Sequence, residues 1–394
     1  MLYILCIFKI KHTLKLYHFI YFFATTWEQH KFEEIFNERR EKTSFENEDI
    51  LLSCAINGIF LNSELFDHFR GSSTIGYLKV KKNDLILSAQ NLHLGNANVN
   101  LRFEHGIISP AYKVYDYIDC NPNFIQSWVK KDETKNFFLS ATTEGASQCR
   151  KNIEWNTLNK QKLLIPKFKE QKKIGEFFKQ LDNDITLHQR KLEKLGNIKK
   201  SMLEKMFPKD ENKVPEIRFK GFNDDWEQYK LGEISNKVTT KNSSLKYLET
   251  FTNSAEYGII SQKDFFENNI SKVEKLDRYY VVEPEDFVYN PRISINAPVG
   301  PINRNTLDRC GVMSPLYSVF KTHNIDNTYL EYFFKSNYWH SFMFFNGDSG
   351  ARSDRFSIKD TVFMEMPIPY PNIYEQSKIG VFLKQLDNDI TLHQ

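Results

Sequence analysis

Arginine, asparagine and glutamine side chains recur in the loops of both halves of this 394-residue sequence. The segment GDSGARSDRFSIKD, residues 347–360, places two arginines among glycine, serine and aspartate. Arginine can chelate O6 and N7 of guanine, and Asn or Gln can do the same to N6 and N7 of adenine. We therefore predict contacts to DNA bases or phosphates. The candidate DNA-binding residues are Gln90, Asn91, Ser147, Gln148, Arg150, Lys151, Asn290, Arg292, Arg304, Arg352, Ser353 and Arg355.

The alternative for each of these residues is a solvated loop position or an arginine paired with a local acid such as Asp354. The formal net charge of the chain is only +3, which neither demands nor excludes nucleic acid. The argument for DNA is that the residues recur at equivalent places in both halves. Each member of the set taken singly would be weak evidence.

Two short motifs could belong to enzymes. NPNF, residues 121–124, resembles the N-P-P-[FY] loop with which amino-methyltransferases hold a flipped base, but its second proline is missing. No glycine-rich cofactor loop opens a βαβ unit upstream, so we interpret NPNF as a helix start. PED, residues 284–286, has no acid-x-Lys partner nearby, and we interpret it as a strand-end turn.

Further signals of catalysis or metal binding are missing from the sequence. It contains no G-x-x-x-x-G-K-[ST] motif, and its histidines lack metal-ligand spacing. The five cysteines form no C-x-x-C pair and are odd in number, which argues against a zinc site or a disulfide framework. We expect no catalytic residue, no cofactor and no metal, and a reducing cytoplasmic location.

A long repeat organises the elements that must position the candidate residues. EQKKIGEFFKQLDNDITLHQ, residues 170–189, returns as EQSKIGVFLKQLDNDITLHQ, residues 375–394, with 17 of 20 positions identical at an offset of 205. Apolar residues in each copy have the spacing of a coiled-coil seam, and the first helix would be roughly 55 Å long. The seam positions are Ile174, Phe178, Leu181, Ile185, Leu192, Leu195 and Met202, followed by Ile379, Leu383, Leu386 and Ile390.

The repeat predicts an α+β protein with two tandem domains of mixed β-strands and helices, each followed by a spacer helix. Within the first domain we expect helix from residue 121 to residue 139. Residues 1–26 are apolar but interrupted by lysines, and they fit neither a membrane span nor a signal peptide. The expected boundaries are 1–26 (atypical N-terminal segment), 27–166 (first domain), 167–207 (first spacer helix), 208–225 (linker), 226–371 (second domain) and 372–394 (second spacer helix).

Taken together, these segments resemble the specificity subunit of type I restriction-modification systems. The resemblance implies two target recognition domains that each read half of a split double-stranded DNA site, joined by coiled-coil helices that pair antiparallel. It also implies no catalysis by the chain, which would dock methyltransferase subunits and a motor-nuclease restriction subunit. The segments that carry it are PEIRFKGFNDDWEQYKLGEI, YNPRISINAPVGPINRN, GDSGARSDRFSIKD and both copies of KIGxFxKQLDNDITLHQ.

Two features depart from that pattern. The amino-terminal lead-in differs from the family's, and the second helix copy stops at Gln394, where the first copy continues as RKLEKLGNIKKSMLEKMFPK. We therefore expect a truncated second helix and a truncated, rearranged or partner-completed subunit. The alternatives are a coiled-coil interaction protein without sequence-specific DNA contact, or a solitary DNA methyltransferase.

Overall fold

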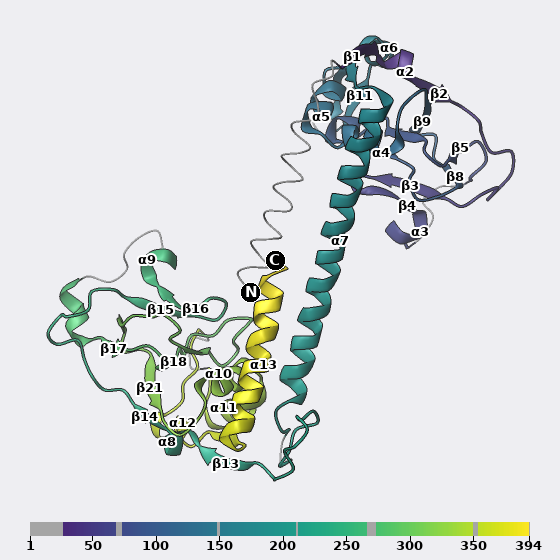
Figure 1. Ribbon diagram of the computed structural model, residues 1–394. Coiled ribbons are helices and arrows are strands. Elements are labelled where there is room, and N and C mark those ends of the chain that lie inside the picture. The colour runs from purple at the N-terminus through teal and green to yellow at the C-terminus, as the bar shows by residue number, and fades with distance from the viewer. Residues whose placement is uncertain are drawn as a thin grey trace. The chain divides into compact units, whose positions relative to one another are not determined.

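The computed structural model describes residues 27–67, 73–147, 150–209, 212–265, 273–349 and 354–393. The chain divides between Thr186 and Leu187 into two compact units, called unit 1 and unit 2 here, and each is described by itself (Figure 1). Residues 1–26, for which the sequence predicts an atypical segment, lie outside the described residues. Among the helices that the structure describes, none combines the length and hydrophobicity that crossing a membrane would require.

Unit 1 is built on a four-stranded antiparallel sheet with the order β2-β9-β6-β7. Two-stranded pairs surround this sheet: β1-β12, β3-β4, β5-β8 and β10-β11. The elements are β1 (Glu28–Lys31), α2 (Phe32–Ile35), β2 (Phe36–Arg39), β3 (Leu52–Ala55), β4 (Gly58–Leu61), α3 (Asn62–Leu65), β5 (Leu78–Lys81), β6 (Leu85–Ser88), η1 (Leu92–Leu94), β7 (Ala97–Val99), β8 (His105–Ile108), β9 (Tyr112–Tyr117), α4 (Pro122–Val129), α5 (Asp132–Leu139), β10 (Thr142–Ser147), β11 (Arg150–Ile153), α6 (Trp155–Lys160), β12 (Lys162–Ile165) and the start of α7 (Phe168–Lys205).

Unit 2 repeats this topology, with a four-stranded sheet of order β14-β21-β18-β19 and the pairs β13-β22, β15-β16 and β17-β20. The duplication inferred from the sequence is therefore confirmed at the level of strand order. The elements are β13 (Glu227–Lys230), α8 (Leu231–Ile234), β14 (Ser235–Lys237), β15 (Phe251–Ser254), β16 (Gly258–Ser261), α9 (Gln262–Phe265), η2 (Val273–Arg278), β17 (Tyr280–Val282), β18 (Phe287–Tyr289), β19 (Ile302–Arg304), β20 (Gly311–Met313), β21 (Ser318–Thr322), α10 (Asn327–Lys335), α11 (Tyr338–Asn346), α12 (Asp360–Phe363), β22 (Pro367–Tyr370) and α13 (Ile373–Thr391).

The NPNF motif opens α4, as predicted. The Asn121 side chain accepts a hydrogen bond from the Phe124 amide at 3.1 Å, and Pro122 occupies the first helical turn, where its missing N–H costs nothing. Helix is confirmed over most of the expected range 121–139, and the structure divides it into the two helices α4 and α5. The break lies at Lys130 and Lys131, between the C-cap of α4 and the N-cap of α5.

The PED motif forms a strand-end turn, as predicted. The Asp286 side chain accepts a hydrogen bond from the Glu283 amide at 2.8 Å, directly before β18. Burial raises the pKa of Asp286 to about 6. Its second carboxylate oxygen is buried without a hydrogen-bond partner among the described residues. This carboxyl group therefore shapes the turn, and the described residues contain no cluster of His, Cys, Asp or Glu that could hold a metal ion.

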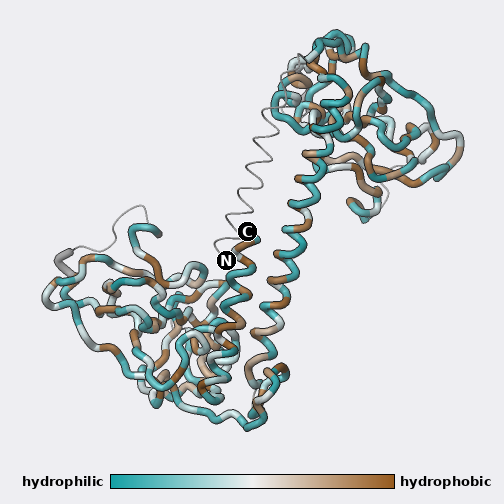
Figure 2. The backbone as a smooth tube through the Cα atoms, viewed as in Figure 1, coloured by the Kyte–Doolittle hydropathy of each residue, from teal (hydrophilic) through white to brown (hydrophobic). Residues whose placement is uncertain are grey.

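Helix α7 has 38 residues and would extend about 57 Å at 1.5 Å per residue. Apolar positions recur along α7 and along α13 (Figure 2). In unit 2 the last turns of α7 lie beside α13, where Leu195, Ile198 and Met202 pack against a core that contains Ile379 and Leu383. The apolar stripe of α13 is thus buried between the domain of unit 2 and the end of α7.

Polar contacts fix the direction of this helix pair. His188 and His393 approach through their Nδ1 atoms at 2.8 Å, and Lys199 forms an ion pair with Asp387. The residue numbers rise along α7 while they fall along α13, so the two helices are antiparallel within unit 2. The predicted antiparallel pairing is confirmed for this segment.

The same seam positions behave differently in unit 1. Ile174 packs against the core of the unit, but Phe178, Leu181 and Ile185 are 41%, 40% and 48% exposed. Leu383, the equivalent of Phe178 at the 205-residue offset, is fully buried. Within unit 1 the seam positions Phe178, Leu181 and Ile185 are therefore not buried, whereas the equivalent position Leu383 is enclosed in unit 2.

Candidate nucleic-acid interface

Two loops of unit 2 that are distant in sequence meet through a short β-bridge. The backbones of Arg292 and Arg355 pair in antiparallel fashion. Beside the bridge, the Phe356 amide donates a hydrogen bond to the Pro291 carbonyl oxygen at 2.7 Å. The sequence singled out both arginines, but only the tertiary fold brings them together across this bridge.

Residues directly opposite each other in an antiparallel pair project to the same face, with their Cβ atoms about 4.5–5.5 Å apart. Arg292 and Arg355 are both exposed, and neither makes an ion pair with an acidic side chain in the part of the chain that the structure describes. Two like charges in this arrangement repel each other. A bound anion would relieve that repulsion, so the pair is suited to a phosphate or to the acceptor edge of guanine.

The loop that carries Arg292 is shaped by Asn290. The Asn290 side chain donates to the Asn253 carbonyl oxygen at 2.8 Å and accepts from the Arg292 amide at 3.0 Å. Gly300, at a φ of +82°, allows the chain to pass so close that a Cβ there would lie 2.1 Å from the Asn290 carbonyl oxygen. The prediction of Asn290 as a base contact is therefore wrong for this conformation, because its amide is used to hold the loop.

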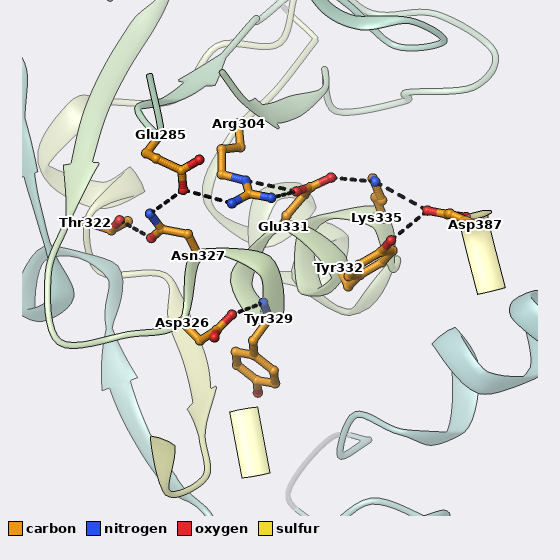
Figure 3. Close-up of polar contacts among 10 residues, drawn as sticks. All are labelled: Glu285, Arg304, Thr322, Asp326, Asn327, Tyr329, Glu331, Tyr332, Lys335 and Asp387. Carbon is orange, nitrogen blue, oxygen red and sulfur yellow. Dashed lines mark hydrogen bonds and ion pairs between the residues drawn. The ribbon is translucent and has the colours of Figure 1, made fainter. Parts of the chain in front are cut away.

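The prediction of Arg304 as a DNA-binding residue is also corrected. Its side chain is only 9% exposed, and its guanidinium donates to Glu331 through Nε at 2.9 Å and to Glu285 through a terminal nitrogen at 2.8 Å (Figure 3). Burial alone would raise the pKa of Glu331, but Lys335 and Arg304 outweigh it and hold that pKa below its ordinary value. Arg304 ties β19 to α10 and is not available to DNA.

This ion-pair network continues to α13. Lys335 lies 2.6 Å from Glu331 and 3.9 Å from Asp387, and the Tyr332 hydroxyl donates to Asp387 at 2.7 Å (Figure 3). Asp387 also pairs with Lys199 of α7. The network therefore connects the sheet of unit 2 with both helices of the antiparallel pair. Sequence analysis missed it because its members are separated by up to 188 residues, the interval from Lys199 to Asp387.

In unit 1 the described candidate residues lie just after β6 and on the β10-β11 hairpin. Gln90 is exposed and Asn91 half-buried just after β6, and the half-buried Lys151 lies on β11. Burial and the nearby charge of Lys151 lower the pKa of His93, which places Lys151 close to the loop after β6.

The remaining candidates can be placed only in part. The backbones of Ser147 and Arg150 face each other at the end of the β10-β11 hairpin. Gln148, Arg352 and Ser353 lie outside the described residues, so their predicted roles stay predictions. Sequence analysis also missed Ile295, which is fully exposed in the Arg292 loop. An isoleucine between the polar residues Ser294 and Asn296 was the available signal.

Comparison with known proteins identifies a matching family and several relatives of this chain. The family model described as "Type I restriction modification DNA specificity domain" matches residues 7–197 and again residues 223–394. The "Type I restriction enzyme MjaVIII specificity subunit" of Methanocaldococcus jannaschii is 26% identical over 275 residues, which are 66% of this chain and 62% of that protein. The chain therefore spans less than two thirds of the length of that relative.

Two solved structures are similar over most of their length. The HsdS subunit from Thermoanaerobacter tengcongensis is 15% identical, with a TM-score of 0.48, covering 94% of this chain and 91% of that one. The S subunit of a type I restriction-modification system from M. genitalium is 12% identical, with a TM-score of 0.50, covering 94% of this chain and 92% of that one. At 12% identity, the similarity to the M. genitalium subunit supports a shared fold.

Proposed function

Because the chain belongs to the family of type I restriction-modification DNA specificity domains, with two matched regions, we propose that it selects the DNA target of such a system. Unit 1 and unit 2 would each read one part of a bipartite duplex site. The chain itself would perform no catalysis. Methyltransferase subunits and a motor-nuclease restriction subunit would bind to it and carry out the chemistry.

The observation that carries this proposal is the exposed Arg292–Arg355 pair of unit 2. Most arginines of the unit for which contacts are described serve the fold: Arg218 binds Glu375, Arg304 binds Glu331 and Arg309 binds Glu249. Arg292 and Arg355 instead stand side by side without an acidic partner in the described part of the unit. Arginine at such a site can bind a phosphate or read guanine in the major groove.

The helices would supply spacing and docking surfaces. One turn of B-DNA is about 34–36 Å long, so a helix of about 57 Å is long enough to set the separation of two half-sites. Two linked readers also gain affinity, since binding of the first raises the effective concentration of the second. We assign the exposed side chains Phe178, Leu181 and Ile185 of α7 to contacts with a partner subunit.

The test is methylation and binding by the chain together with its methyltransferase subunits, compared between Arg292→Ala, Arg355→Ala and the unaltered chain. Arg309→Ala is the matched control, since this arginine is about half exposed and already paired with Glu249. A lost base contact should reduce discrimination at one position about 5- to 150-fold. A lost phosphate contact should instead lower the slope of log K against log salt by about 0.9.

Either outcome supports the proposal. Unchanged target choice and an unchanged salt slope in both variants, with normal complex assembly, would contradict the assignment of these arginines. Methyl transfer by the isolated chain would contradict the non-catalytic role and favour the solitary methyltransferase.

A second candidate is a coiled-coil interaction protein without sequence-specific DNA contact. The exposed seam of α7 favours it, because Phe178, Leu181 and Ile185 present an apolar stripe at helical spacing. Competition between target and random duplexes in a gel-shift assay, with methyltransferase subunits present, separates the two. Equal competition by both duplexes would favour the interaction protein.

A further inference from the structure

The loop that carries Arg292 ends in a tight turn. The Ser294 amide donates to the Ala297 carbonyl oxygen at 3.1 Å, and the Ala297 amide donates back to Ser294 at 3.1 Å. Ile295 and Asn296 form the tip between these two hydrogen bonds. Ala297 and Val299 are buried directly after the tip, which anchors the turn to unit 2.

Ile295 has no role in stabilising this turn. Its side chain is fully exposed, and a β-branched residue is unfavourable at a turn tip, where Gly, Asn, Asp and Pro are preferred for conformational reasons. A residue that breaks a local rule without a compensating contact marks a functional position more often than a structural one. Asn296 at the same tip is exposed as well and makes no hydrogen bond through its amide within the described residues.

We propose that the Ile295–Asn296 tip reads a T·A base pair in the major groove, an inference that rests on the proposed DNA-recognition function. In the major groove the C5 methyl of thymine is the only methyl group that the four unmodified bases present, and an exposed isoleucine is complementary to it. The adenine of the same pair presents N6 and N7, to which an asparagine amide binds in bidentate fashion.

The neighbouring charges orient the tip. Arg292 lies three residues before Ile295, at the β-bridge to Arg355, and both arginines are exposed. Cationic side chains bound to phosphates fix the register of a loop on the duplex, while the base-edge contacts supply specificity. In this arrangement the arginine pair positions the loop, and the tip discriminates.

The experiment uses the chain with its methyltransferase subunits and the target sequence identified from methylated sites of the unaltered complex. Each thymine of the target is replaced by uracil in turn, which removes only the C5 methyl group. One replacement in the half-site read by unit 2 should weaken binding about fourfold, as expected for one buried methyl group. In Ile295→Ala the same replacement should have almost no effect, because the contact is already gone.

Asn296→Ala should relax the preference for adenine at the paired position about 5- to 150-fold. Leu316→Ala is the matched control, since Leu316 is 59% exposed and also lies in a turn, closed by the Tyr317 amide and the Ser314 carbonyl oxygen at 3.0 Å. This control should retain the full sensitivity to uracil.

The inference is overturned if no thymine is sensitive, if the half-site contains none, or if sensitivity persists in Ile295→Ala. It is also overturned if base unstacking, followed with 2-aminopurine, shows Ile295 inserted between base pairs. In all of these cases the unaltered complex still selects its site. If that complex selects no DNA sequence at all, the proposed function fails together with the inference.

Discussion

Leu383 and Phe178 occupy the same position of the duplicated helix and provide a direct test of the packing of unit 2. Leu383 is fully buried in the core shared by α10, α13 and the end of α7, whereas Phe178 is 41% exposed. Replacing a buried leucine by alanine costs about 2–5 kcal/mol, the sum of lost transfer free energy and the cavity left behind. We therefore expect Leu383→Ala to destabilise unit 2 by that amount.

Phe178→Ala should lower the stability of unit 1 by only about 1–2 kcal/mol. Complete burial of a phenylalanine side chain contributes roughly 1.5–3 kcal/mol, and this side chain is partly exposed. Little cavity therefore forms when it is removed. Hydrogen exchange in urea, resolved by peptide, measures the free energy of opening for each unit separately. This resolution is needed because a protein with two units does not unfold in one two-state step.

The expected pattern is a large loss of protection confined to unit 2 in Leu383→Ala, and a small loss in unit 1 in Phe178→Ala. Equal losses in the two variants would refute the argument, since they would mean that the two seam positions are equally buried. A loss in Leu383→Ala that spreads evenly over both units would also count against it, because it would mean that the units do not unfold separately.

Three further outcomes are expected. Arg304→Met should destabilise unit 2 by about 1.5–3 kcal/mol, because Glu331 loses its hydrogen bonds to the guanidinium and keeps only Lys335 as a cationic partner, while target choice in the methylation assay stays unchanged. Asp286→Asn should remove a pH dependence of stability on the order of 1 kcal/mol. Burial raises the pKa of Asp286 to about 6, so folding binds a proton and the stability of the unaltered protein falls as pH rises from about 4 to about 6. A difference in stability between the two proteins that does not change with pH would contradict this. Burial, followed by the charges of Lys191 and His188, lowers the pKa of His393. The end of α13 should therefore lose hydrogen-exchange protection as pH falls below about 6.5. His188→Gln should weaken this response.

Several features of the fold follow from local sequence. The near-identical helix copies at a fixed offset predict two like halves, because the same residue pattern forms the same element wherever it occurs. NPNF predicts a helix start because an Asn side chain caps the N–H groups of the residues that follow it, an interaction confined to four residues. The strand-end turn at PED is equally local.

The candidate site could be predicted only in part. Arg292, Arg304 and Arg355 look alike in sequence, since all three lie in or beside polar loops. Arg304 is buried because Glu331, 27 residues further along the chain, folds against it. Arg292 and Arg355 are exposed together because a β-bridge joins segments 63 residues apart. Which arginine meets a carboxylate is decided by chain folding, and no local pattern carries that information.

The two helices α7 and α13 show the same difference between local sequence and tertiary packing within one repeated motif. Their residue types and spacing determine an amphipathic helix in both copies, because helical periodicity is a property of the segment itself. Burial depends on what the fold places against the stripe: α13 meets the end of α7 and α10, so Leu383 is enclosed, whereas Phe178 remains open to solvent. Residue types and their spacing specify which side chains can form a seam, whereas the packing of distant segments specifies where that seam is buried.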